Sequence, residues 1–210
     1  MALSGFFLMF FLLQHFTINI LSIVNPDAFN EVSHFMGTNF LVQAVLQPVL
    51  MFGIIFHFVM AFVLEIQNRK ARPIGYFAAS TSGGKKVSKN MIYSGIAILL
   101  FMGLHLYDFW VHEMIVKYGQ GDMTGLNANG ELRYYEELVH KFQDVWRVVI
   151  YVAAFVFLGL HTNHGFESSF QSVGANHPKY TPILKKIGFF YSIVIPAGFA
   201  FIAIYHFLIH

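Results

Sequence analysis

The chain has 210 residues, of which 56% are hydrophobic and only 11% are charged. Soluble domains average about 25% charged residues, so this composition excludes an ordinary soluble domain and indicates an integral membrane protein. The chain contains no cysteine, which excludes disulfides, thiolate-ligated haem, c-type haem attachment and cysteine-bound iron–sulfur clusters within it. The net charge of +2 gives no indication of a nucleic-acid partner.

Five apolar stretches are long enough to cross a bilayer, which takes about 20 helical residues. The predicted fold is an all-α bundle of five transmembrane helices forming a single domain over residues 1–210. The spans are expected near residues 2–24, 40–66, 90–116, 142–166 and 185–209. The first stretch lacks the basic residues and the short apolar core of a signal peptide, so we expect it to be a span. Pro48 and Pro196 are expected to kink the second and fifth spans.

The segments between the spans differ in charge, and this predicts the orientation. Segment 67–90 carries six Lys or Arg residues and no acid, and segment 167–186 is also mainly basic. Segment 25–39 carries two acids and no Lys or Arg. Basic loops stay on the cytoplasmic side of a membrane. We therefore expect a cytoplasmic N-terminus and a C-terminus on the outer side.

Four of the spans each carry a histidine near the bilayer interior: His15, His57, His105 and His161. An imidazole in hydrocarbon is costly unless it has a partner. A single transmembrane histidine more often packs or carries a proton than binds haem. One histidine on each of four spans is also what two haems with two axial imidazoles apiece require.

The predicted orientation converts sequence position into depth at about 1.5 Å per residue. His15 and His105 lie roughly 20 and 22 Å from the inner ends of their spans. His57 and His161 lie roughly 14 and 8 Å from the inner ends of theirs. The depths predict an outer pair, His15 with His105, and an inner pair, His57 with His161. Two matched levels favour two haem sites over isolated packing histidines.

At these residues the chain resembles the five-helix, single-chain, dihaem cytochrome b membrane anchor of succinate dehydrogenases and fumarate reductases, the succinate:quinone oxidoreductase family. The resemblance covers nearly the whole chain. It is carried by LxQH at His15, DAFNEVSHFMGTN after the first span, IFHFVMAF at His57, GLHLYDFW at His105 and GLHTNHGFESSF at His161.

The resemblance implies two b-type haems with His15 and His105 as iron ligands of the outer one and His57 and His161 of the inner one. It implies a multi-pass subunit of a bacterial inner (cytoplasmic) membrane, passing electrons in the respiratory chain between an iron–sulfur subunit and a quinone, with menaquinone expected. The partner subunits, an iron–sulfur protein and a flavoprotein on the cytoplasmic face, would hold the clusters and FAD. Dicarboxylate chemistry would occur there and not in this chain.

One position departs from the family pattern. Some members carry a glutamate, linked to proton movement across the membrane, two residues before the ligand in the fourth span. This chain has Gly159 there, so we do not expect that route.

Haem propionates are anionic and need hydrogen-bond donors. The candidates at the inner level are Arg69, Lys70, Arg72, Lys89 and Tyr93. Arg147 lies inside the fourth span near its outer end, where a charged side chain usually has a partner. Asp108 and Asp144, an outer propionate or a quinone oxygen could each pair with it.

Two further histidines could contact the cofactors. His112 follows His105 by seven residues and could bind a propionate, relay protons or pack at the interface. His164 lies one turn after His161; the family's spacing to Gly165 selects His161 as the ligand, so we expect His164 near the inner interface beside a propionate or water. Gly53 and Gly165, four residues from His57 and His161, would let a flat ring approach the backbone.

A quinone site needs groups that exchange protons beside a haem. Segment 25–39 offers Asn30, Glu31 and His34 near the outer level, on a pattern that predicts a short interfacial helix. Packing at the interface is the competing explanation for these residues.

Two other functions remain open from the sequence. The first is a dihaem cytochrome b anchor of another respiratory complex, of the hydrogenase or formate dehydrogenase type. The second is a haem-free transporter or proton channel that uses the histidines as proton carriers. Such transporters often contain inverted repeats, and no convincing repeat is visible in this sequence.

Overall fold

The computed structural model describes residues 1–71, 87–175 and 177–210. These residues form helices, and their only β contact is an isolated bridge between Leu126 and Leu132. The helices are α1 (Ala2–Val24), α2 (Pro26–Thr38), α3 (Gln47–Lys70), α4 (Val87–His105), α5 (His112–Met114), α6 (Tyr134–Phe142), α7 (Val145–Ser172) and α8 (Thr181–Ile209). Three π-helical segments adjoin them: η1 (Val42–Leu46), η2 (Leu106–Val111) and η3 (Ile115–Gly119).

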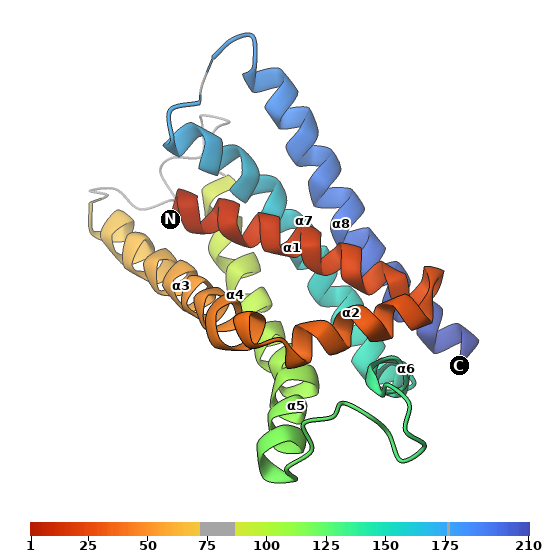
Figure 1. Cartoon of the computed structure of the whole chain (residues 1–210). Helices are drawn as coiled ribbons and strands as arrows, with labels where there is room; N and C mark the ends of the chain where they lie inside the picture. The colour runs from red at the N-terminus through yellow and green to blue at the C-terminus, as the bar shows by residue number, and fades with distance from the viewer. Residues whose placement is uncertain (72–86, 176) are drawn as a thin grey trace.

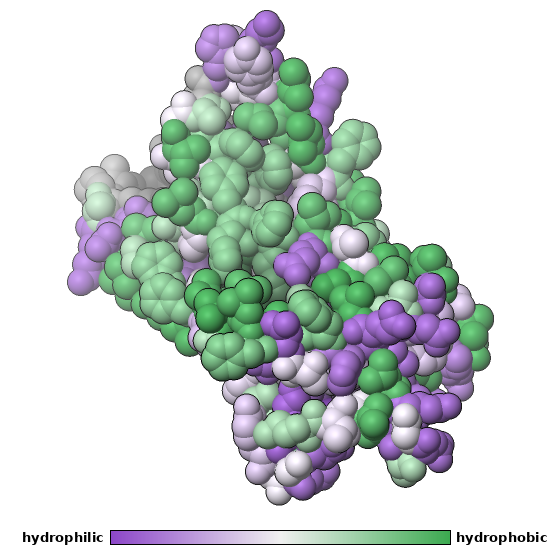
Figure 2. Space-filling view, viewed as in Figure 1, coloured by the Kyte–Doolittle hydropathy of each residue, from purple (hydrophilic) through white to green (hydrophobic). Residues whose placement is uncertain are grey.

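Five helical stretches are long and apolar enough to cross a membrane. They are Ala2–Val24, Val42–Lys70, Met91–Gly119, Val145–Ser172 and Thr181–Ile209, and each contains most of one predicted span. α2 and α6 lie at the same end of the bundle as the C-terminus, which we call the α6 end (Figure 1). Apolar side chains cover the middle of the bundle, and polar ones gather at the α6 end (Figure 2). The chain is therefore an all-helical, multi-pass membrane protein.

Short sequence signals set the helix boundaries at the α6 end. The side chain of Asn25 accepts a hydrogen bond from the backbone N–H of Ala28, and Pro26 occupies the first turn of α2. Both features favour a new helix at this point, because asparagine caps free N–H groups and proline has none to satisfy. Asp144 caps α7 in the same way, accepting from the backbone N–H of Trp146. The predicted short helix after the first span is present as α2.

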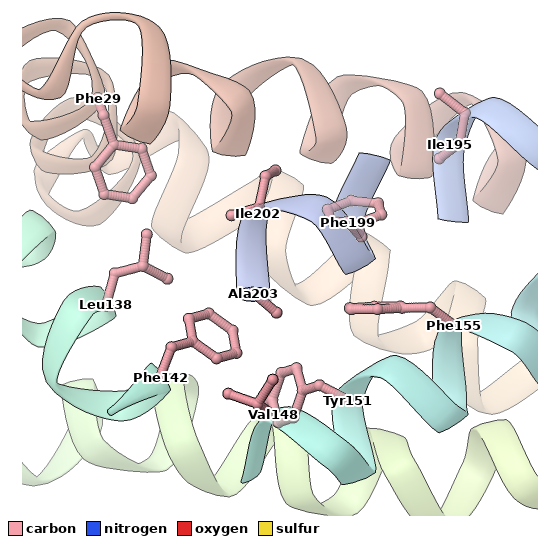
Figure 3. Close-up of a cluster of buried hydrophobic side chains, with 10 residues drawn as sticks. All are labelled: Phe29, Leu138, Phe142, Val148, Tyr151, Phe155, Ile195, Phe199, Ile202 and Ala203. Atoms are coloured by element: carbon pink, nitrogen blue, oxygen red, sulfur yellow. The ribbon is translucent and has the colours of Figure 1, made fainter. Parts of the chain in front are cut away.

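The main buried cluster lies where α7 and α8 pack against α2 and α6 (Figure 3). Its members are Phe29, Leu138, Phe142, Val148, Tyr151, Phe155, Ile195, Phe199, Ile202 and Ala203. By contrast, Gly53 is the only buried residue of α3. The structural core is thus built around the two C-terminal spans, and α3 lies at its edge.

α7 and α8 lie close together at Gly159. A Cβ atom on Gly159 would lie 2.9 Å from the backbone oxygen of Ser192. Pro196 lies inside α8 and has no N–H for the carbonyl of the residue four positions earlier, which is Ser192. The two helices use glycine and proline to pack backbone against backbone, so the family's glutamate has no room at position 159. Pro48, the other predicted kink, lies in the first turn of α3, directly after the π segment η1.

We predict that Gly159→Ala lowers the thermal stability of the protein, because the new methyl group would clash with the Ser192 backbone oxygen, which cannot move away as a side chain could. Overpacking of this kind costs about 1–3 kcal/mol. Gly103→Ala is the matched control, since a Cβ there meets nothing within 4 Å, and alanine stabilises a helix by about 0.5–1 kcal/mol over glycine. Thermal unfolding of the purified protein in detergent measures both. Equal midpoints for the two variants would contradict this packing.

Candidate functional site

The structure brings the four histidines predicted as haem ligands together as two pairs. The rings of His57 on α3 and His161 on α7 have centroids 6.3 Å apart and planes at 70°. The rings of His15 on α1 and His105 at the end of α4 have centroids 5.8 Å apart and planes at 83°. These are the two pairs that the depths predicted. That they bind haem remains a prediction.

Two serines fix the protonation of the His57–His161 pair. Ser4 Oγ lies 3.2 Å from His57 Nδ1, and it donates its own proton to the Met1 carbonyl at 2.7 Å. Ser94 Oγ lies 3.3 Å from His161 Nδ1 and donates to the Met91 carbonyl at 3.0 Å. A hydroxyl has one proton, so each serine must accept from its imidazole. Both rings therefore carry the proton on Nδ1, and Nε2 keeps its lone pair.

The His15–His105 pair is enclosed by aromatic side chains and has no such arrangement. The Asn19 amide nitrogen lies 3.3 Å from His15 Nδ1 and donates to the His15 carbonyl at 2.8 Å. His105 Nδ1 is buried without a hydrogen-bond partner. Phe199 and Tyr151 approach the two imidazoles, with centroids 5.6 Å from His15 and 6.2 Å from His105. This pair thus lies against the main apolar core.

The spacing of both pairs suits one metal atom between two imidazoles. A metal-bound histidine nitrogen lies about 2 Å from its metal, so ring centroids about 6 Å apart would leave room for one metal atom between two imidazoles. The described part of the chain contains no group of three or more histidine, cysteine or acidic side chains that could hold a metal ion. Two imidazoles alone suit haem iron, whose macrocycle supplies the other nitrogens. The residues present therefore fit bis-imidazole haem.

The two glycines expected to leave room for a flat ring have other neighbours. A Cβ on Gly53 would lie 2.6 Å from the ring of Phe7, so Gly53 accommodates that side chain. A Cβ on Gly165 would lie 3.7 Å from the Met91 methyl group. Gly95 on α4 and Gly5 on α1 face the His161 and His57 imidazoles, with their Cβ positions 3.5 Å and 4.0 Å from the Cε1 atoms. A phenylalanine ring thus lies against Gly53 in this structure, and the approach of a haem to this glycine remains a prediction.

A buried carboxylate lies one turn after His105. Asp108 is 1% exposed, and both of its carboxylate oxygens accept a hydrogen bond from Arg147 Nε at 3.0 Å. The Tyr151 hydroxyl donates a further hydrogen bond to Asp108 at 2.9 Å. Arg147 also lies 3.4 Å from Asp144. Both acids considered as partners from the sequence therefore pair with Arg147. The π segment η2 begins directly after His105 and contains Asp108, as π segments often adjoin functional sites.

Three of the other predicted propionate contacts, Arg69, Lys70 and Tyr93, lie among the described residues. Arg69 pairs with Glu65 at 2.7 Å, Lys70 is exposed at the end of α3, and Tyr93 is 65% exposed. Arg72 and the side chain of Lys89 lie outside the described residues.

The two additional histidines have different surroundings. His164 Nδ1 is buried without a hydrogen-bond partner. His112 Nε2 lies 3.3 Å from Glu137 Oε1, so it belongs to a polar cluster at the α6 end. Contact of either histidine with a cofactor remains a prediction.

The three predicted quinone residues have three different environments on α2. Asn30 accepts a hydrogen bond from the backbone N–H of Tyr135 at 2.8 Å and so joins α2 to α6. Glu31 is exposed. His34 faces the Tyr134 ring at 6.2 Å, and its Nδ1 atom is buried without a partner. Of these three residues, only His34 has a buried polar atom without a hydrogen-bond partner.

Sequence reasoning missed the polar partners of the histidines. Asn19 could have been found, because it lies four residues after His15 on the same helix face. Ser4 and Ser94 reach their histidines from other helices, at separations of 53 and 67 residues. No spacing rule connects residues on different helices, so these contacts required the structure.

A comparison with protein-family models, curated proteins and solved structures finds no match for this chain.

We predict that Asp108→Asn strongly destabilises the protein, because Arg147 and Tyr151 would lose a shared buried anion. Removing one partner of a buried pair costs about 3–5 kcal/mol. Asp144→Asn is the control: its side chain is 47% exposed, and exposed pairs contribute less than about 1 kcal/mol. Thermal unfolding and the yield of folded protein from membranes measure the difference. Equal losses of thermal stability and yield in the two variants would show that the buried contacts of Asp108 with Arg147 and Tyr151 stabilise the protein no more than the exposed pair does.

Proposed function

We propose that this chain is the dihaem cytochrome b membrane anchor of a succinate:quinone oxidoreductase (complex II). The observation that carries the proposal is the pairing of four transmembrane histidines at a spacing that suits one metal per pair. The protonation of His57 and His161 supports it, because a metal-binding imidazole donates its other N–H to a neighbouring group. The family motifs that the sequence resembles select this type of complex.

The charge of the loops supports an orientation for the complex. We place the basic segments 67–90 and 167–186 in the cytoplasm, and with them the His57–His161 level nearest to the soluble subunits. The iron–sulfur protein would dock on that face beside the flavoprotein. The α6 end would face outward, with the His15–His105 pair nearest to it. Electrons would then pass through the inner level and the outer level to or from the quinone.

The residues of this chain have distinct tasks in that transfer. His15, His57, His105 and His161 would hold the two haems, which supply one-electron chemistry when bound. Ser4 and Ser94 orient two of the imidazoles. The aromatic side chains around His15 and His105 exclude water, and Asp108 with Arg147 places a fixed, nearly neutral charge pair one turn away. Such surroundings set the potential of an electron carrier.

The hydrogen bonds argue against the proton-carrier alternative. A proton relay needs each imidazole to pass a proton to a group that can pass it further. Ser4 and Ser94 use their own protons on backbone carbonyls, which are not proton carriers. Proton transfer from His57 or His161 therefore ends at its serine. A dihaem anchor of a hydrogenase or formate dehydrogenase shares the same histidine geometry, and the identity of co-purifying subunits separates it from our proposal.

The direct test counts haem in the complex purified from membranes together with its partner subunits. We predict two b-type haems per chain by pyridine haemochrome analysis, and an iron–sulfur subunit with a flavoprotein in the same preparation. His57→Ala and His161→Ala should each remove half of the haem, because each breaks the same pair. His15→Ala and His105→Ala should each remove the other half.

His140→Ala is the control for these four variants, since His140 is exposed on α6. It should keep both haems. A wild-type complex without haem, from cells supplied with haem and all subunits, would overturn the dihaem proposal. Retention of both haems in the His57 and His161 variants would overturn the assignment of ligands.

A further inference from the structure

A groove between α7 and α8 lies on the outer surface of the bundle. It has a volume of about 450 Å³, and its lining comes from residues within 152–163 of α7 and within 189–200 of α8. Three apolar side chains of this lining, Val156, Leu160 and Ile193, are 62%, 52% and 49% exposed although they lie in membrane spans. An unfilled groove loses the packing contacts of its walls. We therefore expect an apolar group from the membrane to fill it; we call it the α7–α8 groove.

The length of the α7–α8 groove indicates what fills it. Its lining covers about 16 Å along each helix at 1.5 Å per residue. The hydrocarbon core of a bilayer is about 30 Å thick, so one leaflet contributes about 15 Å. A transmembrane helix packed along α7 and α8 would need a surface as long as the whole core. An acyl chain occupies one leaflet, so the length favours a lipid chain.

One end of the groove adjoins two lysines near the start of α8. Phe189, at the end of the lining, follows Lys185 by four residues and Lys186 by three, so both lysines continue the same helix face. Lys185 pairs with Glu167 at 2.8 Å, and both side chains are exposed. Lys186 is exposed and forms no ion pair with any residue that the structure describes. This end of the groove therefore carries an unpaired positive charge.

A second hollow precedes the groove. α8 begins at the end of the bundle opposite the α6 end (Figure 1). The hollow there has a volume of about 460 Å³ and is lined by Pro178, Thr181, Pro182 and Lys185. Lys185 thus borders this hollow and lies one turn before the groove. A polar headgroup can lie in the hollow while its chain lies in the groove.

Asn163 places an amide group on the surface near the basic end of the groove. Its side chain is exposed, and its Oδ1 atom lies 3.4 Å from the Ser192 hydroxyl, which donates at 2.8 Å to the Phe189 carbonyl. The Asn163 amide nitrogen donates to no other residue in the described part of the chain. A polar group that faces hydrocarbon without a partner costs free energy. The ester carbonyl of a phospholipid can accept this hydrogen bond.

We propose that the α7–α8 groove binds an anionic phospholipid. One acyl chain lies between the two helices, an ester carbonyl accepts the hydrogen bond of Asn163, and Lys186 binds the phosphate. Basic pockets between transmembrane helices on the cytoplasmic side bind such headgroups, and anionic lipids are concentrated in that leaflet. The inference does not rest on the proposed function, because none of the four paired histidines lines the groove.

Native mass spectrometry of the protein purified from membranes, with any co-purifying subunits, tests this site. The delipidated protein is titrated in detergent with dioleoylphosphatidylglycerol or dioleoylphosphatidylcholine. We expect the first phosphatidylglycerol to bind about fivefold more tightly than the first phosphatidylcholine. We also expect phosphatidylglycerol to raise the thermal midpoint more, because a ligand of the folded state stabilises that state. Equal binding of the two lipids by wild type would contradict the proposal.

Lys186→Gln tests recognition of the headgroup. We expect the affinity for phosphatidylglycerol to fall about fivefold, to the level of phosphatidylcholine, because the positive charge beside the phosphate is lost. Lys141→Gln is the matched control, since it removes the same charge from α6, at the other end of the bundle. It should keep the preference for phosphatidylglycerol. A preference that survives in Lys186→Gln would show that the headgroup lies elsewhere.

Ala197→Phe tests the chain site. Ala197 is exposed and lines the groove, so a phenyl ring there fills the groove without entering the core. We expect the first molecule of either lipid to bind about tenfold more weakly, while the thermal midpoint of the lipid-free protein does not fall. Val194→Phe is the control, because Val194 is 54% exposed and is not part of the lining. It should bind both lipids as wild type does.

A different occupant of the groove would give a different result. If a second copy of the chain or a helix of another subunit fills the groove, Ala197→Phe would release that chain and lower the mass of the complex in mild detergent. That outcome would overturn the lipid site. Wild-type affinity for phosphatidylglycerol in Ala197→Phe would overturn it as well, because the first lipid would then bind outside the groove.

Discussion

The cost of placing an imidazole inside a bilayer is the constraint on which this structure depends. Each transmembrane histidine needs a polar partner, because lipid offers none. The chain meets this need by pairing histidines between helices and, at His57 and His161, by placing a serine on each Nδ1 atom. Because each serine already donates to a carbonyl, the arrangement also determines which imidazole nitrogen is left to bind a metal. Helix packing and the protonation of these two imidazoles thus depend on the same contacts.

The two levels of the bundle are built differently. The His15–His105 pair lies against the aromatic core of α7 and α8, with a buried ion pair one turn beyond it. The His57–His161 pair involves α3, which contributes only Gly53 to the buried residues. We therefore expect α3 to depend for its position on what His57 binds, whereas the rest of the bundle is held by its own side chains. At the α6 end, an ionic network around Arg133 lies beside the apolar packing of α2 and α6.

The sequence predicted the spans and the pairing, but much less of the site's surroundings. Apolar length depends on local composition, and it placed five long helices correctly. The two histidine pairs are as expected, while the orientation that loop charge predicts stays a prediction. The depth argument worked because rise per residue is nearly constant in a helix. Contacts such as Ser94 with His161, or Arg133 with Glu113, join separate elements, and nothing in a single sequence specifies them. Spacing on one helix also could not reveal that Phe7 of another helix lies against Gly53.

Low-temperature electron paramagnetic resonance of the oxidised, purified complex tests the central claim most directly. Haem iron held by two histidine imidazoles would be low-spin in the ferric state. The account predicts two such low-spin signals, with the one lost in His57→Ala different from the one lost in His15→Ala. High-spin ferric haem as the main signal in the intact complex would contradict it, because that would mean an axial position without an imidazole.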